Sequence, residues 1–196
     1  RERKLPVMNY EKILSRRVQE IKPSGIRRFF DMLEEMKDVI GLTVGQPDFV
    51  TPWHIREAGI QSLETGKTFY TANAGLFELR QEINNYMTRR FDLSYDPASE
   101  IIVTVGGSEA IDIAMRATLD LGDEVIIPTP SFVCYEPLAK MAGAKPVILE
   151  TTFEDEFKIN PDELKNLITD KTKMIILPFP SNPTGAIMTR EDLEEI

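Results

Sequence analysis

The chain has 196 residues, of which 42% are hydrophobic and 28% are charged, proportions typical of a globular protein with one sizeable core. Its net charge of −9 disfavours nucleic acid and anionic membranes as main partners, because both bind basic surfaces. The sequence contains no apolar run of about 18 residues, so it predicts no membrane-spanning segment.

The first half of the chain reads mainly as helices joined by loops. Ser24 is a suitable N-cap for the second helix, and Thr51-Pro52 marks the start of the third, because proline is favoured in a first helical turn. The expected elements are helices over residues 13–21, 24–36, 51–64 and 76–91, a short strand over 39–44 and a polar loop over 67–75.

From residue 100 onward, apolar stretches alternate with stretches of helical spacing. The expected strands cover residues 101–105, 124–128, 145–149 and 174–177, and the expected helices cover 108–119, 133–141 and 161–167, with a last helix opening at Thr189. Asp192 follows Thr189 as a short form of the capping box. Strands alternating with helices at this spacing predict an α/β fold with a mainly parallel sheet and flanking helices, preceded by an N-terminal helical arm.

A phosphate group would fit the turn at Gly106-Gly107-Ser108, between an expected strand and an expected helix. Glycines let a ligand approach the backbone, and a helix start offers N–H groups at the positive end of the dipole. The sequence is neither a Walker loop nor a G-x-G-x-x-G fingerprint, so a plain tight turn is the alternative. Glu109, in the first turn, is interpreted as a helix cap.

Other candidate ligand groups follow strands or lie in loops, and each has a structural alternative. Phe132 follows a strand and could stack on a flat heterocycle or belong to the core. Asn182 lies in the rigid loop Ser-Asn-Pro-Thr-Gly after a buried strand, where α/β sheets place ligand groups, or in an ordinary turn. The Gly45 N–H could bind a carboxylate, and the Tyr70 hydroxyl a phosphate, but a bare turn and a cover for apolar surface are the alternatives.

Cysteine and histidine usage restricts the remaining chemistry. One cysteine, Cys134, excludes an internal disulfide, and one histidine, His54, limits any metal site to carboxylate ligands, so we expect no metal. We interpret Cys134 as a small apolar residue inside a helix and His54 as a surface or packing residue. The low cysteine content favours a reduced, cytoplasmic location.

Taken in order, several segments resemble the fold-type I pyridoxal-phosphate (PLP) aminotransferases, class I/II, around the bacterial aspartate and aromatic aminotransferases. Each match is weak alone, but the ordered set spans nearly the whole chain, and Ser-Asn-Pro-Thr-Gly is its most specific member. The matching segments are residues 22–24, 45–52, 70–80, 103–110, 122–125, 130–132 and 181–185.

The resemblance implies a role for each candidate at the cofactor. Gly107 and Ser108 would bind the PLP phosphate through backbone N–H groups and the serine hydroxyl. Phe132 would stack on the pyridine ring, where many relatives have tryptophan or tyrosine. Asn182 would donate its amide to the phenolic oxygen of PLP. Tyr70 would reach the phosphate of the neighbouring subunit, which makes the active site a property of a homodimer.

The implied reaction moves an amino group between an L-amino acid and a 2-oxo acid, with Gly45 and Asn182 holding the substrate carboxylate. PLP would act as an electron sink. In the family, the lysine that forms the Schiff base follows the Ser-Asn-Pro-Thr-Gly loop, as do the aspartate and arginine of the site, so all three are expected beyond Ile196. We therefore expect no catalytic residue in this chain, and no transaminase activity without the missing C-terminal half of the same protein.

Two other functions share these segments. A PLP-dependent C–S lyase or eliminase is one. A non-catalytic PLP-binding or dimerisation module is the other, although the chain has no basic recognition helix of the kind expected in a transcription regulator.

The resemblance also implies a domain division and a backbone feature. Residues 1–45 would form an N-terminal arm and part of the small domain, and residues 46–196 a partial PLP-binding large domain, truncated after the Ser-Asn-Pro-Thr-Gly loop. We expect a fragment of a longer protein, with Met8 as a candidate native start. We also expect at least one cis peptide bond among Thr129–Pro130 and Asn182–Pro183.

Overall fold

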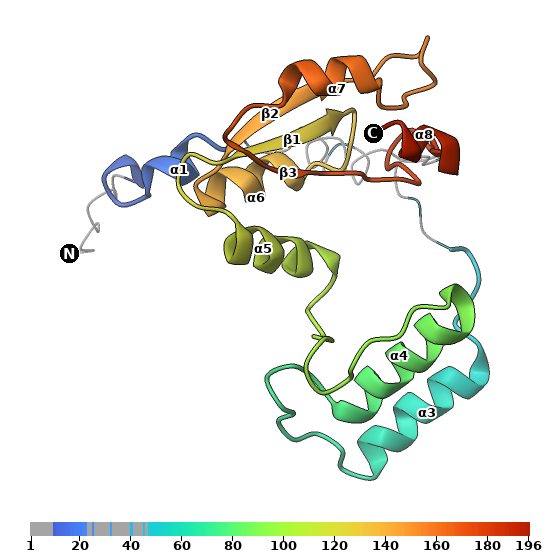
Figure 1. Ribbon diagram of the computed structural model, residues 1–196. Helices are drawn as coiled ribbons and strands as arrows, with labels where there is room; N and C mark the ends of the chain where they lie inside the picture. The colour runs from blue at the N-terminus through green and yellow to red at the C-terminus, as the bar shows by residue number, and fades with distance from the viewer. Residues whose placement is uncertain (1–9, 23–24, 26–31, 33–39, 41–44, 46) are drawn as a thin grey trace, which may run out of the picture. The chain divides into compact units, whose positions relative to one another are not determined.

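The computed structural model describes residues 10–22, 25, 32, 40, 45 and 47–196. The chain divides into two compact units, one formed by residues 1–24 and 106–196 and the other by residues 25–105 (Figure 1). The expected helix over 24–36 and the expected strand over 39–44 lie almost entirely outside the described residues. The division into domains at residues 45/46 stays a prediction.

A three-stranded parallel sheet organises the first unit. The strands are β1 (Glu124–Thr129), β2 (Lys145–Glu150) and β3 (Thr172–Ile175), in the order β2-β1-β3. Ile126 of β1 lies opposite Val147 of β2 and Ile175 of β3. Three of the expected strands are therefore present and parallel, which confirms the predicted fold class. The strand expected over 174–177 starts and ends two residues earlier than predicted.

Helices cover both faces of this sheet. Figure 1 shows α5 (Gly107–Thr118) and α6 (Tyr135–Ala142) on one face and α7 (Pro161–Leu167) on the other. Alternate residues of β1 serve the two faces: Val125 and Ile127 join the cluster on the α5 and α6 side, and Ile126 joins the cluster on the α7 side. A central strand buried on both faces explains the continuous apolar run that predicted it.

The N-terminal arm and the last helix complete this unit. The N-terminal arm contains a 3-10 turn (Tyr10–Lys12) and α1 (Arg16–Gln19), which is shorter than the helix expected over 13–21. The Arg17 guanidinium donates to the carbonyl of Met141 at 3.3 Å. The last helix, α8 (Arg190–Glu194), begins after Thr189, and the capping box of Thr189 and Asp192 is confirmed.

The predicted strand over residues 101–105 is wrong, because these residues form no strand in the structure. A strand needs a ladder of backbone hydrogen bonds to a neighbouring strand, which residues 101–105 do not form, and the Val103 N–H instead donates to the Ala74 carbonyl at 2.9 Å. Gly75, with φ +96°, packs so closely here that an added Cβ would lie 2.6 Å from Val103 Cβ. At the end of this segment, Val105 is 91% exposed.

Two long helices organise the described part of the second unit. They are α3 (Trp53–Glu64), which begins after Pro52 at the N-cap, and α4 (Phe77–Phe91). The helices expected over 51–64 and 76–91 are thus confirmed, although Pro52 lies one position earlier than expected. Arg80 of α4 is 6% exposed, and its guanidinium donates to the carbonyls of Pro97 and Ala98.

Cis peptide bonds occur at Thr129–Pro130 and Asn182–Pro183, which confirms that expectation, and also at Phe179–Pro180. Among the described helices, none combines the length and the apolar character that crossing a membrane requires.

Candidate functional site

Three of the segments that carry candidate residues meet the same edge of the sheet. Because the strands are parallel, β1 and β3 end at one edge, and the loops that follow them carry Phe132 and Asn182. Helix α5 leads back into the start of β1 through residues 119–123, so its own first residue lies toward this edge (Figure 1). The carboxyl edge therefore gathers the first turn of α5 and two strand-ending loops.

The first turn of α5 offers an open backbone. Gly106 is the N-cap with φ +83°, a conformation that side chains with a Cβ rarely adopt. A Cβ added at Gly106 or Gly107 would meet no atom within 4 Å, and Ser108 is exposed. An anion could approach the backbone at Gly107 and Ser108, at the positive end of a 12-residue helix, so the turn fits a phosphate group.

Phe132 is half-buried and has an aromatic neighbour. Its ring lies 5.8 Å from that of Tyr135, centroid to centroid, and the two planes meet at 87°, an edge-to-face arrangement. The Tyr135 N–H also donates to the Phe132 carbonyl at 3.3 Å. Phe132 thus lies at the start of α6 and outside the buried clusters, which suits a ring that contacts a ligand.

Cys134 links this segment to the first turn of α5. Burial raises the pKa of the Cys134 thiol, and a hydrogen bond from the Ser108 side chain opposes that rise. The bond brings Ser108 beside the segment that carries Phe132. Cys134 was predicted to lie inside a helix, but in the structure it is the N-cap of α6, one position before the first helical residue. Its side chain makes no capping hydrogen bond.

Asn182 lies in a tightly closed loop after β3. The Ser181 N–H donates to the Ala186 carbonyl, and the Gly185 N–H donates to the Ser181 carbonyl, both at 2.8 Å. Phe179 anchors the start of the loop by packing against the cluster that contains Ile126. The Asn182 carboxamide is exposed, so a ligand can reach it.

Gly45 and Tyr70 belong to the unit formed by residues 25–105, and both are exposed there. Their roles at a substrate carboxylate and at a partner subunit's phosphate stay predictions. Tyr135 is a neighbour of the site that the sequence analysis missed. Its signal was the spacing of three residues from Phe132, and the turn closed by the bond from the Tyr135 N–H to the Phe132 carbonyl brings the two side chains together.

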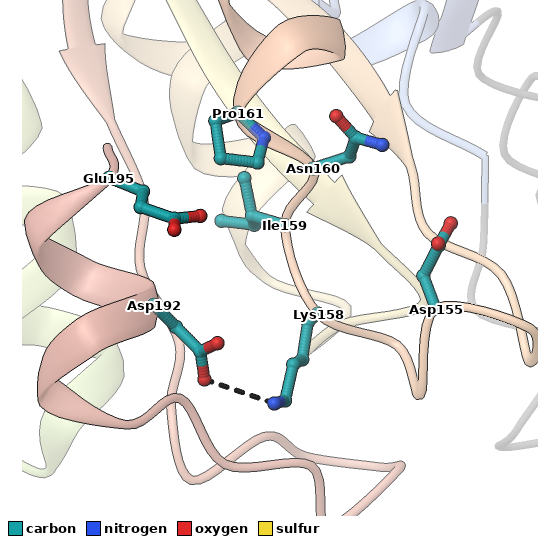
Figure 2. A pocket seen from close by; sticks show the side chains of 7 residues that line it. All are labelled: Asp155, Lys158, Ile159, Asn160, Pro161, Asp192 and Glu195. Atoms are coloured by element: carbon teal, nitrogen blue, oxygen red, sulfur yellow. Dashed lines mark ion pairs between the residues drawn. The ribbon is translucent and has the colours of Figure 1, made fainter.

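A cavity of about 220 Å³ lies apart from these residues, between α8 and the start of α7 (Figure 2). Lys158 faces it, and its ammonium pairs with the Asp192 carboxylate at 3.0 Å. Asp155 and Glu195 add two further carboxylates to the lining. Three carboxylates against one paired lysine disfavour a phosphate, so this cavity is no alternative site for a phosphorylated cofactor.

The chain was also compared with known proteins. The pattern of the family "Aminotransferase class I and II" matches residues 37–196. A Bacillus subtilis protein, YugH, named as an aminotransferase, is 55% identical over 183 residues, which are 93% of this chain and 47% of that protein. An aspartate aminotransferase of Pyrococcus abyssi is 46% identical over the same shares of the two chains.

Solved structures agree with these matches. The aspartate aminotransferase from Thermus thermophilus with maleate superposes with a TM-score of 0.85 at 40% identity, over 93% of this chain and 48% of that one. The chain thus spans about half the length of the relatives that it matches.

Proposed function

Because the chain belongs to the aminotransferase class I and II family, we propose that its parent protein moves an amino group between an L-amino acid and a 2-oxo acid. The family depends on PLP. The observation that carries the proposal is the open backbone at Gly107, at the same carboxyl edge of the sheet as the loops that carry Phe132 and Asn182. In this proposal, residues 46–196 are part of the PLP-binding large domain, and residues 1–45 are an arm with part of the small domain.

Each proposed cofactor contact follows from the chemistry of the residue. The N–H groups of Gly107 and Ser108, together with the Ser108 hydroxyl, would hold the phosphate. Phe132 would stack on the pyridine ring, and the Asn182 amide would donate to the phenolic oxygen. When bound, PLP supplies an electron sink for the substrate α-carbon. The protein residues bind and orient it so that this chemistry occurs in one geometry.

The substrate and partner contacts are also proposals. The Gly45 N–H and the Asn182 amide would bind the substrate carboxylate. The Tyr70 hydroxyl would donate to the phosphate in a second copy, so that the protein works as a homodimer. The relatives are named for aspartate, aromatic amino acids and N-acetyl-LL-diaminopimelate, so their names do not identify one amino donor. A cytoplasmic location stays a prediction.

The decisive experiment compares the complete protein with residues 1–196 alone. We expect the complete protein to convert an amino acid and a 2-oxo acid into the exchanged pair, with an absorbance band of bound PLP. We expect residues 1–196 alone to show no turnover, because the resemblance places the lysine, aspartate and arginine of the family after the Ser-Asn-Pro-Thr-Gly loop, outside these residues. Turnover by 1–196 without another chain would contradict this. Release of ammonia or sulfide from the amino acid would instead identify an eliminase or C–S lyase, and PLP binding without turnover would identify a non-catalytic module.

Single substitutions in the complete protein test the contacts. Ser108→Ala and Asn182→Ala should each weaken PLP binding by about 10- to 100-fold, because each removes a hydrogen bond to a charged group worth about 1.5–3 kcal/mol. Ser99→Ala, in the unit formed by residues 25–105, is the control for loss of a serine hydroxyl. Equal PLP dissociation constants for Ser108→Ala and the unmodified protein would show that the Ser108 hydroxyl does not contribute to PLP binding.

A further inference from the structure

The edge-to-face contact of Phe132 and Tyr135 restricts a ring that the proposed function uses. Rings at 87° with centroids 5.8 Å apart are in the preferred range for aromatic pairs. A phenylalanine ring otherwise turns easily about its last torsion, which is broad. At most one face of Phe132 can meet Tyr135, so this contact does not cover the other face.

Tyr135 itself is held by the core. It packs against the cluster that contains Met115, Val125 and Ile127, and it is the first residue of α6. Burial raises the pKa of its hydroxyl, which agrees with a ring placed among apolar side chains. A ring fixed by a packed core is a rigid support for its neighbour.

We propose that Tyr135 is a positioning residue, whose ring fixes the plane in which Phe132 presents a face to a flat heterocycle at the carboxyl edge of β1. The proposal rests on the proposed stacking role of Phe132. Stacking depends on the angle between two ring planes, so a freely turning Phe132 would lose part of the contact each time it left that plane. The ring of Tyr135, and not its hydroxyl, carries this role.

Three variants of the complete protein test the proposal by binding and spectroscopy. Tyr135→Leu should raise the PLP dissociation constant by about two- to tenfold, the range that an aromatic pair contributes. It should also reduce the circular dichroism of the bound PLP band, which reports the fixed orientation of the ring. Tyr135→Phe keeps the ring and should retain both values. Tyr135→Met is a second variant without a ring, for use if Tyr135→Leu does not fold.

A matched core variant separates positioning from stability. Leu164→Ala removes a residue that is 2% exposed on the other face of the sheet, so it should lower the free energy of unfolding while leaving the PLP band unchanged. If Leu164→Ala weakens the PLP band as much as Tyr135→Leu does, the effect is general destabilisation and the proposal fails. If Tyr135→Phe behaves like Tyr135→Leu, the hydroxyl carries the role and the proposal also fails.

A measurement without cofactor separates this inference from the proposed function. With ring-labelled phenylalanine, the NMR signal of Phe132 is assigned by its loss in Phe132→Leu. In Tyr135→Leu the line shape of that signal should show faster turning of the ring; its chemical shift is not used, because loss of the Tyr135 ring current changes it in any case. An unchanged turning rate would overturn the inference whether or not PLP binds. A raised turning rate, in a protein that does not bind PLP, would support the inference about ring orientation and refute the proposed function.

Discussion

The two units of the chain bury their apolar side chains to very different extents. Residues 106–196 form a buried cluster on each face of β1, and Val125, Ile126 and Ile127 are at most 1% exposed. In the described part of residues 25–105, Arg80 is the one buried residue, and large apolar side chains such as Trp53, Leu63 and Phe69 are at least 58% exposed. The same chain thus contains one unit with its own core and one whose apolar surface faces outward.

This contrast indicates where the stability of the chain lies. Burial of a large aliphatic side chain contributes about 1.5–3 kcal/mol, whereas an exposed one contributes almost nothing until a partner surface covers it. The sheet unit can therefore hold the carboxyl edge in place by its own packing. The contribution of α3 and α4 is expected to grow when their apolar faces are covered.

The largest expected difference comes from equivalent truncations in the two units. Ile126→Ala should lower the free energy of unfolding by about 2–5 kcal/mol, because it leaves a cavity at a fully buried position. Leu63→Ala, at a position that is 68% exposed, should change it by less than about 0.5 kcal/mol. Urea denaturation of both variants measures the difference. Equal losses of stability would mean that α3 is as well packed as β1, which would contradict the difference in packing between the two units.

Arg80 provides the sharpest test inside the second unit. Arg80→Met removes the bonds to the Pro97 and Ala98 carbonyls and the contact with the Phe77 ring, which lies 5.4 Å from the guanidinium carbon. We expect a loss of about 1–3 kcal/mol, reduced because the buried Arg80 Nε has no partner. Amide exchange at Glu100, whose N–H donates to the Asp96 carbonyl at 2.8 Å, should become faster.

The control for this variant is Arg89→Met on the exposed face of the same helix, where the guanidinium carbon lies 6.0 Å from the Tyr86 ring. It should leave exchange at Glu100 unchanged. If both arginine variants act equally on Glu100, Arg80 is not what holds residues 96–100.

The opposite edge of the sheet should make the first unit sensitive to acid. Glu124 is 6% exposed, and its carboxylate accepts from the Lys145 ammonium at 2.9 Å and the Thr169 hydroxyl at 2.7 Å. The hydrogen bond from Lys145 has the largest effect and that from Thr169 the next largest, and both lower the pKa of Glu124 below its ordinary value. Because the folded pKa is lowered, this contribution to stability is complete above the unfolded pKa, about 4.3. It is lost as the pH falls through the lower, folded value.

Denaturation between about pH 3 and pH 7 measures this effect. Glu124→Gln should flatten the acid side of the stability profile, since its amide does not titrate in this range. Thr169→Val should flatten it only in part, because the bond to Lys145 remains. An unchanged acid limb in Glu124→Gln would show that other carboxylates cause the loss.

The fold of the first unit was largely predictable, because its strands and helices pack locally and their periodicity survives in the structure. The helix over 161–167 has the predicted bounds, and β1 differs by one residue. The strand prediction over residues 101–105 is wrong because periodicity reports apolar character, whereas a strand also needs a neighbouring strand to pair with. The proximity of Ser108 and Cys134 was missed because it depends on how α5 and α6 pack, which spacing along the chain does not encode. Tyr135 was missed although its spacing from Phe132 is visible in the sequence.

The smallest expected effect belongs to the ion pair between Lys158 and Asp192, which ties α8 to the segment before α7 (Figure 2). The two side chains are 30% and 28% exposed, so solvent screens their attraction, and such pairs contribute about 0–1 kcal/mol. Lys158→Met should therefore cost less than about 1 kcal/mol by urea denaturation, and the difference should shrink further in about 1 M salt. Lys165→Met, on an exposed position of α7, is the control. A larger, salt-independent loss would mean that the Lys158 ammonium stabilises α8 by more than a solvent-screened ion pair, because methionine keeps an apolar side chain of similar length.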